Sequence, residues 1–278
     1  MHHKLGDNAF GDLLRFWRSC KKLSQEQLAD KVESSTRQIS RIEMGTSRPS
    51  ESLVNNITIA LGLLERDKNN LRIAAGFPTQ SSHMHFHSSE MKWLRNAMML
   101  SLKAQEPFPS MLLGETGDIL MVNRSWVCFF RTTLSAERLN TVNNYWEFLF
   151  SEDGLGCYLE GWEDNIAVIY MGVYQGMILN RNPSIYRILK ILRSHHCFPT
   201  DWVERASRLA PMASYRIRIP FNKELTNFYS VHQTVGALGL SSFVSAPHLT
   251  INTLYPENDG NTALQFKLDD VSHPLLRY

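Results

Sequence analysis

The chain has 278 residues and a mass of 32.0 kDa, which is long for one ordinary domain and typical of two. Apolar residues make up 43% and charged residues 20% of the sequence, a composition that supports a sizeable core and excludes a disordered chain. The formal net charge is only +2, so the chain as a whole gives no electrostatic indication of a nucleic-acid partner.

The charge is distributed unevenly along the chain. Residues 1–78 contain twelve Lys and Arg against nine Asp and Glu, whereas residues 79–278 contain 17 against 18. The sequence therefore predicts a basic domain over residues 1–78 and a nearly neutral domain after it.

The compartment is predicted from cysteine usage and from the absence of targeting patterns. The four cysteines are scattered without a C-x-x-C pair, which favours free thiols: Cys20, Cys128, Cys157 and Cys197. The start lacks the pattern of a signal peptide, and the most apolar run, residues 166–179, is too short to span a bilayer. We expect a cytoplasmic protein without a membrane partner.

The N-terminal domain is predicted to consist of short helices. Ser24 can cap one helix, with Gln27 placed to complete a capping box. Ser35 can cap the next helix, with Gln38 in the same relation, and Gly45 is a typical helix end. Only three or four residues separate these two helices. Such a short connection leaves no room for an antiparallel hairpin and predicts a helix-turn-helix.

The second helix of this pair has two distinct faces. Its isoleucines point toward the preceding helix, while four residues form a polar, basic face: Thr36, Arg37, Ser40 and Arg41. Arginine can bind guanine through two hydrogen bonds, worth about 1–3 kcal/mol of discrimination between bases. We expect this face to contact bases, with phosphate or supporting contacts from Gln25, Gln38 and Arg48. The alternative is a solvated bundle whose arginines only maintain solubility.

Three segments together resemble the XRE/Cro-repressor helix-turn-helix family: residues 24–29, residues 39–45, and Arg48-Pro49-Ser50. The resemblance implies an all-α, lambda-repressor-like domain that binds double-stranded DNA. That family usually has glycine between the two helices, where this chain has Glu33, so we expect a strained turn. One small module makes few contacts, and we therefore expect a homodimer on two half-sites about 34–36 Å apart.

A polar stretch over residues 79–89 is typical of an interdomain linker. It contains three histidines at alternate positions, which would lie on one side of an extended chain: His83, His85 and His87. No acidic residue or cysteine lies nearby, so the sequence gives no metal site here.

Residues 90–278 alternate between helical and strand-like patterns. Helices are predicted over residues 90–103, 123–130, 162–179, 183–192 and 201–209. Strands are predicted over residues 110–113, 119–122, 215–220, 228–235 and 248–254, with the first two forming a hairpin. Five strands with helices inserted between the second and third predict an α+β domain with one antiparallel sheet.

This region resembles the C-terminal ligand-binding domain of MmyB-like transcription regulators. The resemblance is carried, in order, by Ala74–Phe77, Gln105–Pro109, Val122–Arg124, Ser151–Gly154, Gly161–Glu163 and Thr253–Asn258. It implies a PAS-like sheet that encloses a small apolar ligand, with a fatty acid as the known type.

The helix from Trp162 is apolar on most of its circumference, and its two glycines, Gly172 and Gly176, are four residues apart. They either leave a groove for an acyl chain or let another element pack closely. The ligand contacts predicted from this helix and the aromatic helix before it are Asn123, Trp126, Trp162, Ile166, Tyr170, Val173 and Met177. The alternative is a dimerisation or partner-binding domain without a ligand.

A carboxylate on the ligand would need a donor, and the candidates are Asn123, Arg124, Arg216, Arg218 and His232. Strand alternation places the arginines at 216 and 218 on the face opposite two isoleucines, and therefore toward solvent. The sequence thus selects no particular anchor for a carboxylate.

Enzymatic functions are disfavoured by the absence of catalytic motifs such as H-E-x-x-H, G-x-S-x-G or a P-loop. Ser110 could serve as the nucleophile of a self-cleaving repressor, but residues 140–165 contain no lysine to activate it. His195, His196 and Cys197 fit a helix end better than a metal site. We expect a regulator that is not an enzyme and has no cofactor other than a bound fatty acid or similar lipid-like ligand.

Overall fold

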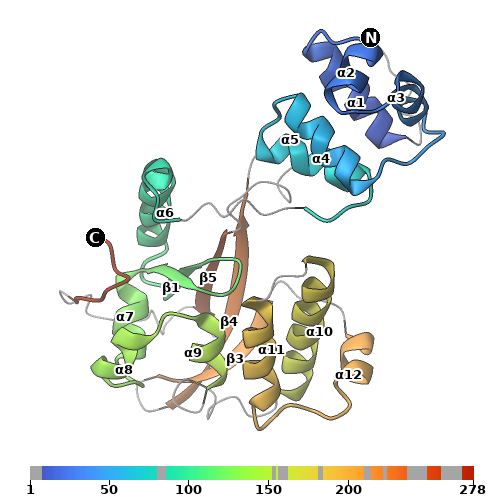
Figure 1. Ribbon diagram of the computed structural model, residues 1–278. Helices are drawn as coiled ribbons and strands as arrows, with labels where there is room; N and C mark the ends of the chain where they lie inside the picture. Colours follow the sequence, from blue (N-terminus) through green and yellow to red (C-terminus); the bar gives the residue numbers. More distant parts are fainter. Residues whose placement is uncertain are drawn as a thin grey trace. The chain divides into compact units, whose positions relative to one another are not determined.

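A computed structural model describes residues 8–79, 86–151, 155, 162–180, 184–209, 214–221, 224–236, 249–257 and 271–278 (Figure 1). They form two compact units, which we call the N-terminal unit (residues 8–79) and the C-terminal unit (described residues from 86 onward). The boundary falls among residues 80–85, outside the described residues, and so do His83, His85, Cys157 and most of residues 151–161. The linker predicted over residues 79–89 therefore stays a prediction over residues 80–85, whereas residues 86–89 belong to the C-terminal unit.

The N-terminal unit is all-α, as predicted. It contains α1 (Ala9–Cys20), α2 (Gln25–Lys31), α3 (Thr36–Glu43), α4 (Glu51–Ala60) and α5 (Glu65–Ala74). The apolar faces of the helices meet in one core, whose fully buried members include Leu14, Leu28, Ile39, Ile42, Ile57 and Leu71. The two isoleucines of α3 thus face inward, as the helical pattern predicts.

The connection between α2 and α3 follows the predicted capping chemistry with one difference. Ser24 and Gln27 form both hydrogen bonds of a capping box. Ser35 accepts the Gln38 backbone N–H, but the Gln38 side chain accepts the hydroxyl hydrogen of Ser34. Glu33 has a φ of 52°, the left-handed conformation that glycine adopts most easily. The strained turn expected from the absent glycine is therefore present.

The C-terminal unit is α+β, with five strands in one antiparallel sheet of order β2-β1-β5-β4-β3. The strands are β1 (Ser110–Leu113), β2 (Ile119–Val122), β3 (Ser214–Phe221), β4 (Glu224–Val235) and β5 (Leu249–Pro256). The helices are η1 (Ser89–Met91), α6 (Lys92–Ala104), α7 (Arg124–Phe130), α8 (Ala136–Thr141), α9 (Tyr145–Phe150), α10 (Glu163–Asn180), α11 (Ser184–Ser194) and α12 (Trp202–Arg208). The short helices α8 and α9 were not predicted, because six residues carry too little helical periodicity.

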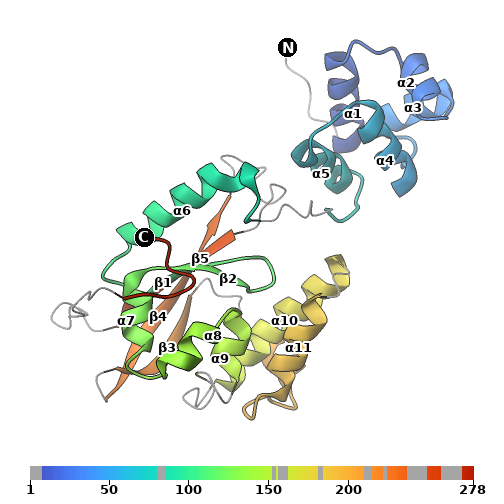
Figure 2. The ribbon, with the colours of Figure 1, turned by 60° about the vertical axis from the view of Figure 1, so that its left-hand side comes forward.

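Helices cover both faces of the sheet, α6 on one and α7, α9, α10 and α11 on the other (Figure 2). Alternation along the strands sorts their side chains between two cores. Leu112 and Ile251 pack with α6, whereas Met111 and Leu254 pack with the helices of the opposite face. We call the second surface, which carries the larger core, the inner face of the sheet.

Trp126 lies at the centre of the larger core and has no exposed surface. Its ring lies 5.1 Å from that of Phe130 and 5.5 Å from that of Phe148. The aromatic residues of α7 and α9 are therefore mainly core residues of the C-terminal unit. None of the helices that the structure describes has both the length and the apolar character of a membrane-spanning segment.

Candidate DNA-binding surface and ligand groove

The outer face of α3 is polar and open to solvent. Thr36, Arg37, Gln38 and Arg41 are exposed, and Ser40 is partly exposed. A buried set on the same helix fixes this orientation: Ile39, Ile42 and Glu43. The structure therefore brings the five α3 residues predicted from the sequence to one accessible surface.

The buried carboxylate of Glu43 holds α3 against the first two helices. Arg18 in α1 donates from Nε to Oε1 at 2.6 Å and from Nη2 to Oε2 at 3.0 Å. Gln25 in α2 donates to Oε2 at 2.9 Å. Burial alone would raise the pKa of Glu43, but the hydrogen bonds from Arg18 and Gln25 outweigh it and hold that pKa below its ordinary value.

The arginines of the N-terminal unit fall into two groups. Arg18 binds Glu43, and Arg72 binds Glu51 and Asn55, so both cations are used within the fold. Among the residues that the structure describes, the side chains of Arg37, Arg41 and Arg48 form no ion pair or hydrogen bond, and all three are exposed. Their charges are thus available to an external partner.

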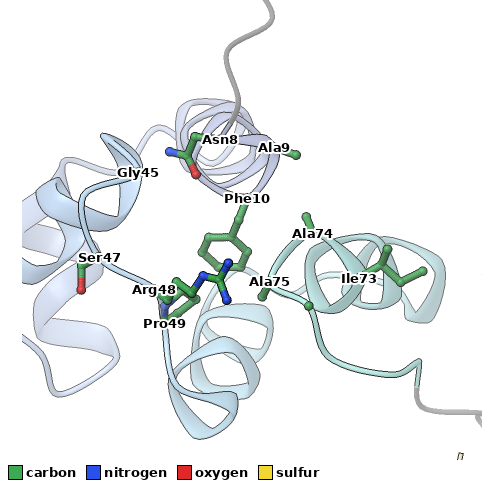
Figure 3. A pocket seen from close by; sticks show the side chains of 11 residues that line it. Asn8, Ala9, Phe10, Gly45, Ser47, Arg48, Pro49, Ile73, Ala74 and Ala75 are labelled. Atoms are coloured by element: carbon green, nitrogen blue, oxygen red, sulfur yellow. The ribbon is translucent and has the colours of Figure 1, made fainter. Parts of the chain in front are cut away.

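Arg48 lies at a pocket of about 380 Å³ in the N-terminal unit. The walls come from the start of α1, the loop after α3 and the end of α5, and the Arg48 side chain extends between them (Figure 3). Gly45 at the start of that loop has a φ of 75°, and a Cβ there would come within 2.9 Å of Asn8. This glycine lets the loop turn tightly and carry Arg48 beside α1.

A groove of about 290 Å³ lies along α10 in the C-terminal unit. It is lined by Trp146, Val168, Ile169, Met171, Gly172, Val173, Gln175, Ala206 and Leu209. At Gly172 and Gly176 an added Cβ would meet no described atom within 4 Å. Of the two roles predicted for these glycines, the open surface is therefore present among the described residues, and close packing by another element is not.

Trp146 forms one wall of this groove and is positioned by the hairpin between β1 and β2. Gly117 in that hairpin has a φ of 81°, and a Cβ there would lie 2.4 Å from the indole of Trp146. Only glycine allows both this backbone conformation and the close approach of the ring. The turn at Gly117 thus positions one wall of the groove.

The predicted ligand residues do not all reach the groove. Val173 lines it, and Met177 is half-buried against the core. Four others are at most 5% exposed and belong to the core itself: Trp126, Trp162, Ile166 and Tyr170. Sequence periodicity identified the helix but could not separate its groove side from its core side, because α10 is apolar almost all round.

Asn123 has no hydrogen-bonding capacity left for a ligand. Its Oδ1 accepts the backbone N–H groups of Ser110 and Trp126, and its Nδ2 donates to the carbonyls of Leu102 and Phe108. The side chain is fully buried. Asn123 therefore joins β1, α6 and α7, and we leave it out of the ligand-contacting residues.

The remaining polar candidates have separate positions. Arg216 and Arg218 are exposed, as strand alternation predicts, and Arg216 binds Glu257 at 2.6 Å. The guanidinium of Arg124 lies 5.4 Å from the ring centre of Tyr278. His195 to Cys197 directly follow the end of α11, as predicted.

Sequence reasoning missed Trp146, Ala206 and Leu209 as groove residues. Trp146 lies in the aromatic run Tyr145–Phe150, but its outward position depends on packing against Gly117. Ala206 and Leu209 lie in or next to α12, which contacts α10 only in the folded unit. No local pattern in the sequence marks these two positions.

Two family models match the chain. The model described as "Helix-turn-helix domain" matches residues 9–71, and the model described as "MmyB-like transcription regulator ligand binding domain" matches residues 94–265. The chain belongs to the MmyB-like transcription regulators. This MmyB-like regulator thus combines a helix-turn-helix DNA-binding domain with a ligand-binding domain.

Other comparisons add little to this assignment. No curated protein matches the MmyB-like regulator. A solved structure, ComR from Streptococcus suis, is 15% identical, and the match covers 73% of this chain and 72% of that one. The TM-score is 0.22, and we draw no conclusion from this likeness.

Proposed function

We propose that this MmyB-like regulator binds operator DNA in a sequence-specific manner through α3 and responds to a small apolar ligand, such as a fatty acid, in its C-terminal unit. The main support for the proposal is the contrast between arginines that are paired within the fold and arginines that are exposed on α3. Arg18 and Arg72 are bound within the fold, whereas Arg37 and Arg41 are exposed on the outer face of α3 without a partner among the described residues.

The dimensions of α3 suit the major groove. An α-helix with its side chains is about 10–12 Å across, and the major groove, roughly 12 Å wide, admits it. Thr36, Arg37, Ser40 and Arg41 are assigned to bases. Gln38 and Arg48 are assigned to phosphates, and Gln25, whose amide donates to Glu43, supports α3.

The DNA-binding assignment is tested with Arg41→Ala in the full chain. Operator fragments are first selected from random DNA by the wild-type protein, and affinity is then measured for selected and scrambled sequences. Loss of a bidentate guanine contact weakens binding to the selected sequence by about 1–3 kcal/mol and narrows its preference over scrambled DNA.

The matched control is Arg66→Ala, which removes the same charge from an exposed arginine that pairs with its neighbour Asp67. This control should leave the preference between sequences unchanged. If Arg41→Ala binds the selected sequence with unchanged affinity and unchanged preference over scrambled DNA, α3 is not the recognition helix.

The groove along α10 supports an apolar ligand in a PAS-like domain. Most of its lining side chains are aliphatic or aromatic, Val173 among them. The core next to the groove is formed or contacted by the other predicted ligand residues: Trp126, Trp162, Ile166, Tyr170 and Met177. We propose that ligand binding shifts the population between a DNA-competent and an incompetent state of a cytoplasmic homodimer.

The ligand assignment is tested by extracting the purified protein with organic solvent and identifying the released lipid by mass spectrometry. A fatty acid recovered in stoichiometric amount supports the sensor. If no lipid is recovered and added fatty acids do not bind, the C-terminal unit is only a dimerisation or partner-binding domain.

A further inference from the structure

Three polar side chains lie next to one another on the inner face of the sheet. In the register of β4 and β5, His232 pairs with Asn252, and Ser230 lies two residues from His232 on the same face. Asn252 also pairs with Met111 of β1, a member of the larger core. We call Ser230, His232 and Asn252 the inner-face polar cluster.

Ser230 and Asn252 are buried and His232 is half-buried, and the amide nitrogen of Asn252 lies within hydrogen-bond distance of the other two side chains. This Nδ2 lies 2.7 Å from the Ser230 Oγ and 3.3 Å from the His232 Nε2. The Oδ1 has no hydrogen-bond partner among the described residues, although Asn252 is only 1% exposed. Exchanging the amide oxygen and nitrogen would leave the other atom without a partner, so one amide position stays unsatisfied in either orientation.

An unsatisfied amide atom on this face is unusual because buried polar groups in native proteins are nearly always hydrogen-bonded. The surrounding residues of the inner face are apolar and offer no partner: Met111, Phe228 and Leu254. The position is therefore suited to a hydrogen-bonding group that comes from outside the chain.

Contacts between aromatic rings connect the inner-face polar cluster with the groove along α10. The ring of Tyr145 in α9 lies 6.0 Å from that of His232 and 5.2 Å from that of Trp146. Trp146 in turn lines the groove. The ring contacts Trp146–Tyr145 and Tyr145–His232 thus connect the groove to the inner-face polar cluster.

We propose that the inner-face polar cluster anchors the polar head group of the ligand, with Asn252 forming the direct hydrogen bond and Ser230 holding its amide in place. This inference rests on the proposed ligand-sensing function and adds the chemistry of the ligand to it.

The cluster selects an uncharged head group. Burial lowers the pKa of His232, so its imidazole is neutral near pH 7 and supplies no cation to balance a carboxylate. A hydroxyl or a protonated carboxyl group both donates and accepts, and can therefore satisfy the free amide atom in either orientation. The ligand class is an amphiphile with an apolar tail and such a head.

The test measures binding of decan-1-ol to the full chain by native mass spectrometry and by ligand-induced shift in melting temperature. Asn252→Leu keeps the branching and the number of side-chain heavy atoms but removes the amide, and it should weaken binding about tenfold. Ser230→Ala is a smaller change and provides a second test if the Asn252→Leu variant fails to fold. It should weaken decan-1-ol binding severalfold.

The matched control is Thr253→Val, which removes a buried hydroxyl from the next residue on the opposite face of β5, where it bonds with Ser110. It should leave decan-1-ol binding unchanged. The head-group anchor is overturned if the Asn252 and Ser230 variants bind decan-1-ol with wild-type affinity, or if the control loses as much affinity as they do. Either result leaves the proposed ligand-sensing function intact. If decan-1-ol and decanoic acid both fail to bind the wild type, the sensor and this anchor are overturned together.

Discussion

Arg18 in α1 and Glu43 in α3 form a two-point ion pair in which the Glu43 side chain is only 1% exposed. The same guanidinium donates from Nη1 to the carbonyl of Leu23, just before α2. One arginine thus connects the first helix, the start of the second and the end of the third. The pair fixes the helix that we assign to DNA bases without touching its exposed face.

Removing one partner of this pair should be costly. Glu43→Ala leaves the Arg18 charge partly buried and uncompensated, and should lower the free energy of unfolding of the N-terminal unit by about 3–5 kcal/mol. Hydrogen exchange of α1 and α3 peptides in the full chain under increasing urea measures this change. The double variant Arg18→Met, Glu43→Leu should recover part of the loss; a double variant as unstable as the sum of the single ones would contradict direct coupling.

The same carboxylate should make the N-terminal unit sensitive to acid. The pKa of Glu43 lies below its ordinary value of 4.5 in the folded protein, so the unfolded chain binds the proton more readily. Its stabilising contribution is therefore complete above the ordinary pKa and is lost as the pH falls through the folded pKa. Unfolding measured between pH 7 and pH 3 should show a flatter profile for Glu43→Gln than for the wild type. Identical profiles would exclude Glu43 as a source of acid sensitivity.

Two glycines near the groove should respond oppositely to alanine. Gly172 lies in α10 with open space at its Cβ position, so Gly172→Ala should stabilise the C-terminal unit by about 0.5–1 kcal/mol through helix propensity. Gly117→Ala should destabilise it, because its backbone has a positive φ and the methyl group would collide with Trp146. Thermal unfolding compares the two variants, and a destabilising Gly172→Ala would mean that another element packs against α10.

Asn123 should behave as a structural residue. Asn123→Ala leaves two buried backbone N–H groups and two carbonyls without their partner, and should cost at least about 2–3 kcal/mol of stability. Urea denaturation followed by tryptophan fluorescence measures the loss, since Trp126 lies next to this network. A stable variant that has lost only ligand affinity would return Asn123 to the binding site.

The sequence by itself determined the features that depend on neighbours along the chain. Ser24, Ser35 and Gly45 set the limits of α2 and α3, because caps and helix ends are local hydrogen-bonding events. Alternation between Arg216 and Ile217 fixed which face of β3 is buried. The family resemblance of both domains was also readable from short motifs and is confirmed by the family models.

Only the tertiary structure decided how distant residues use their polar groups. The sequence suggested Asn123 as a donor for a ligand, but in the fold its amide is fully used by four backbone groups, from β1, α6, α7 and the loop after α6. Asn252, which no motif marks, retains a buried amide atom without a partner among the described residues. Helical and strand periods specify the face on which a side chain lies, but hydrogen-bond satisfaction depends on which groups folding brings within about 3 Å.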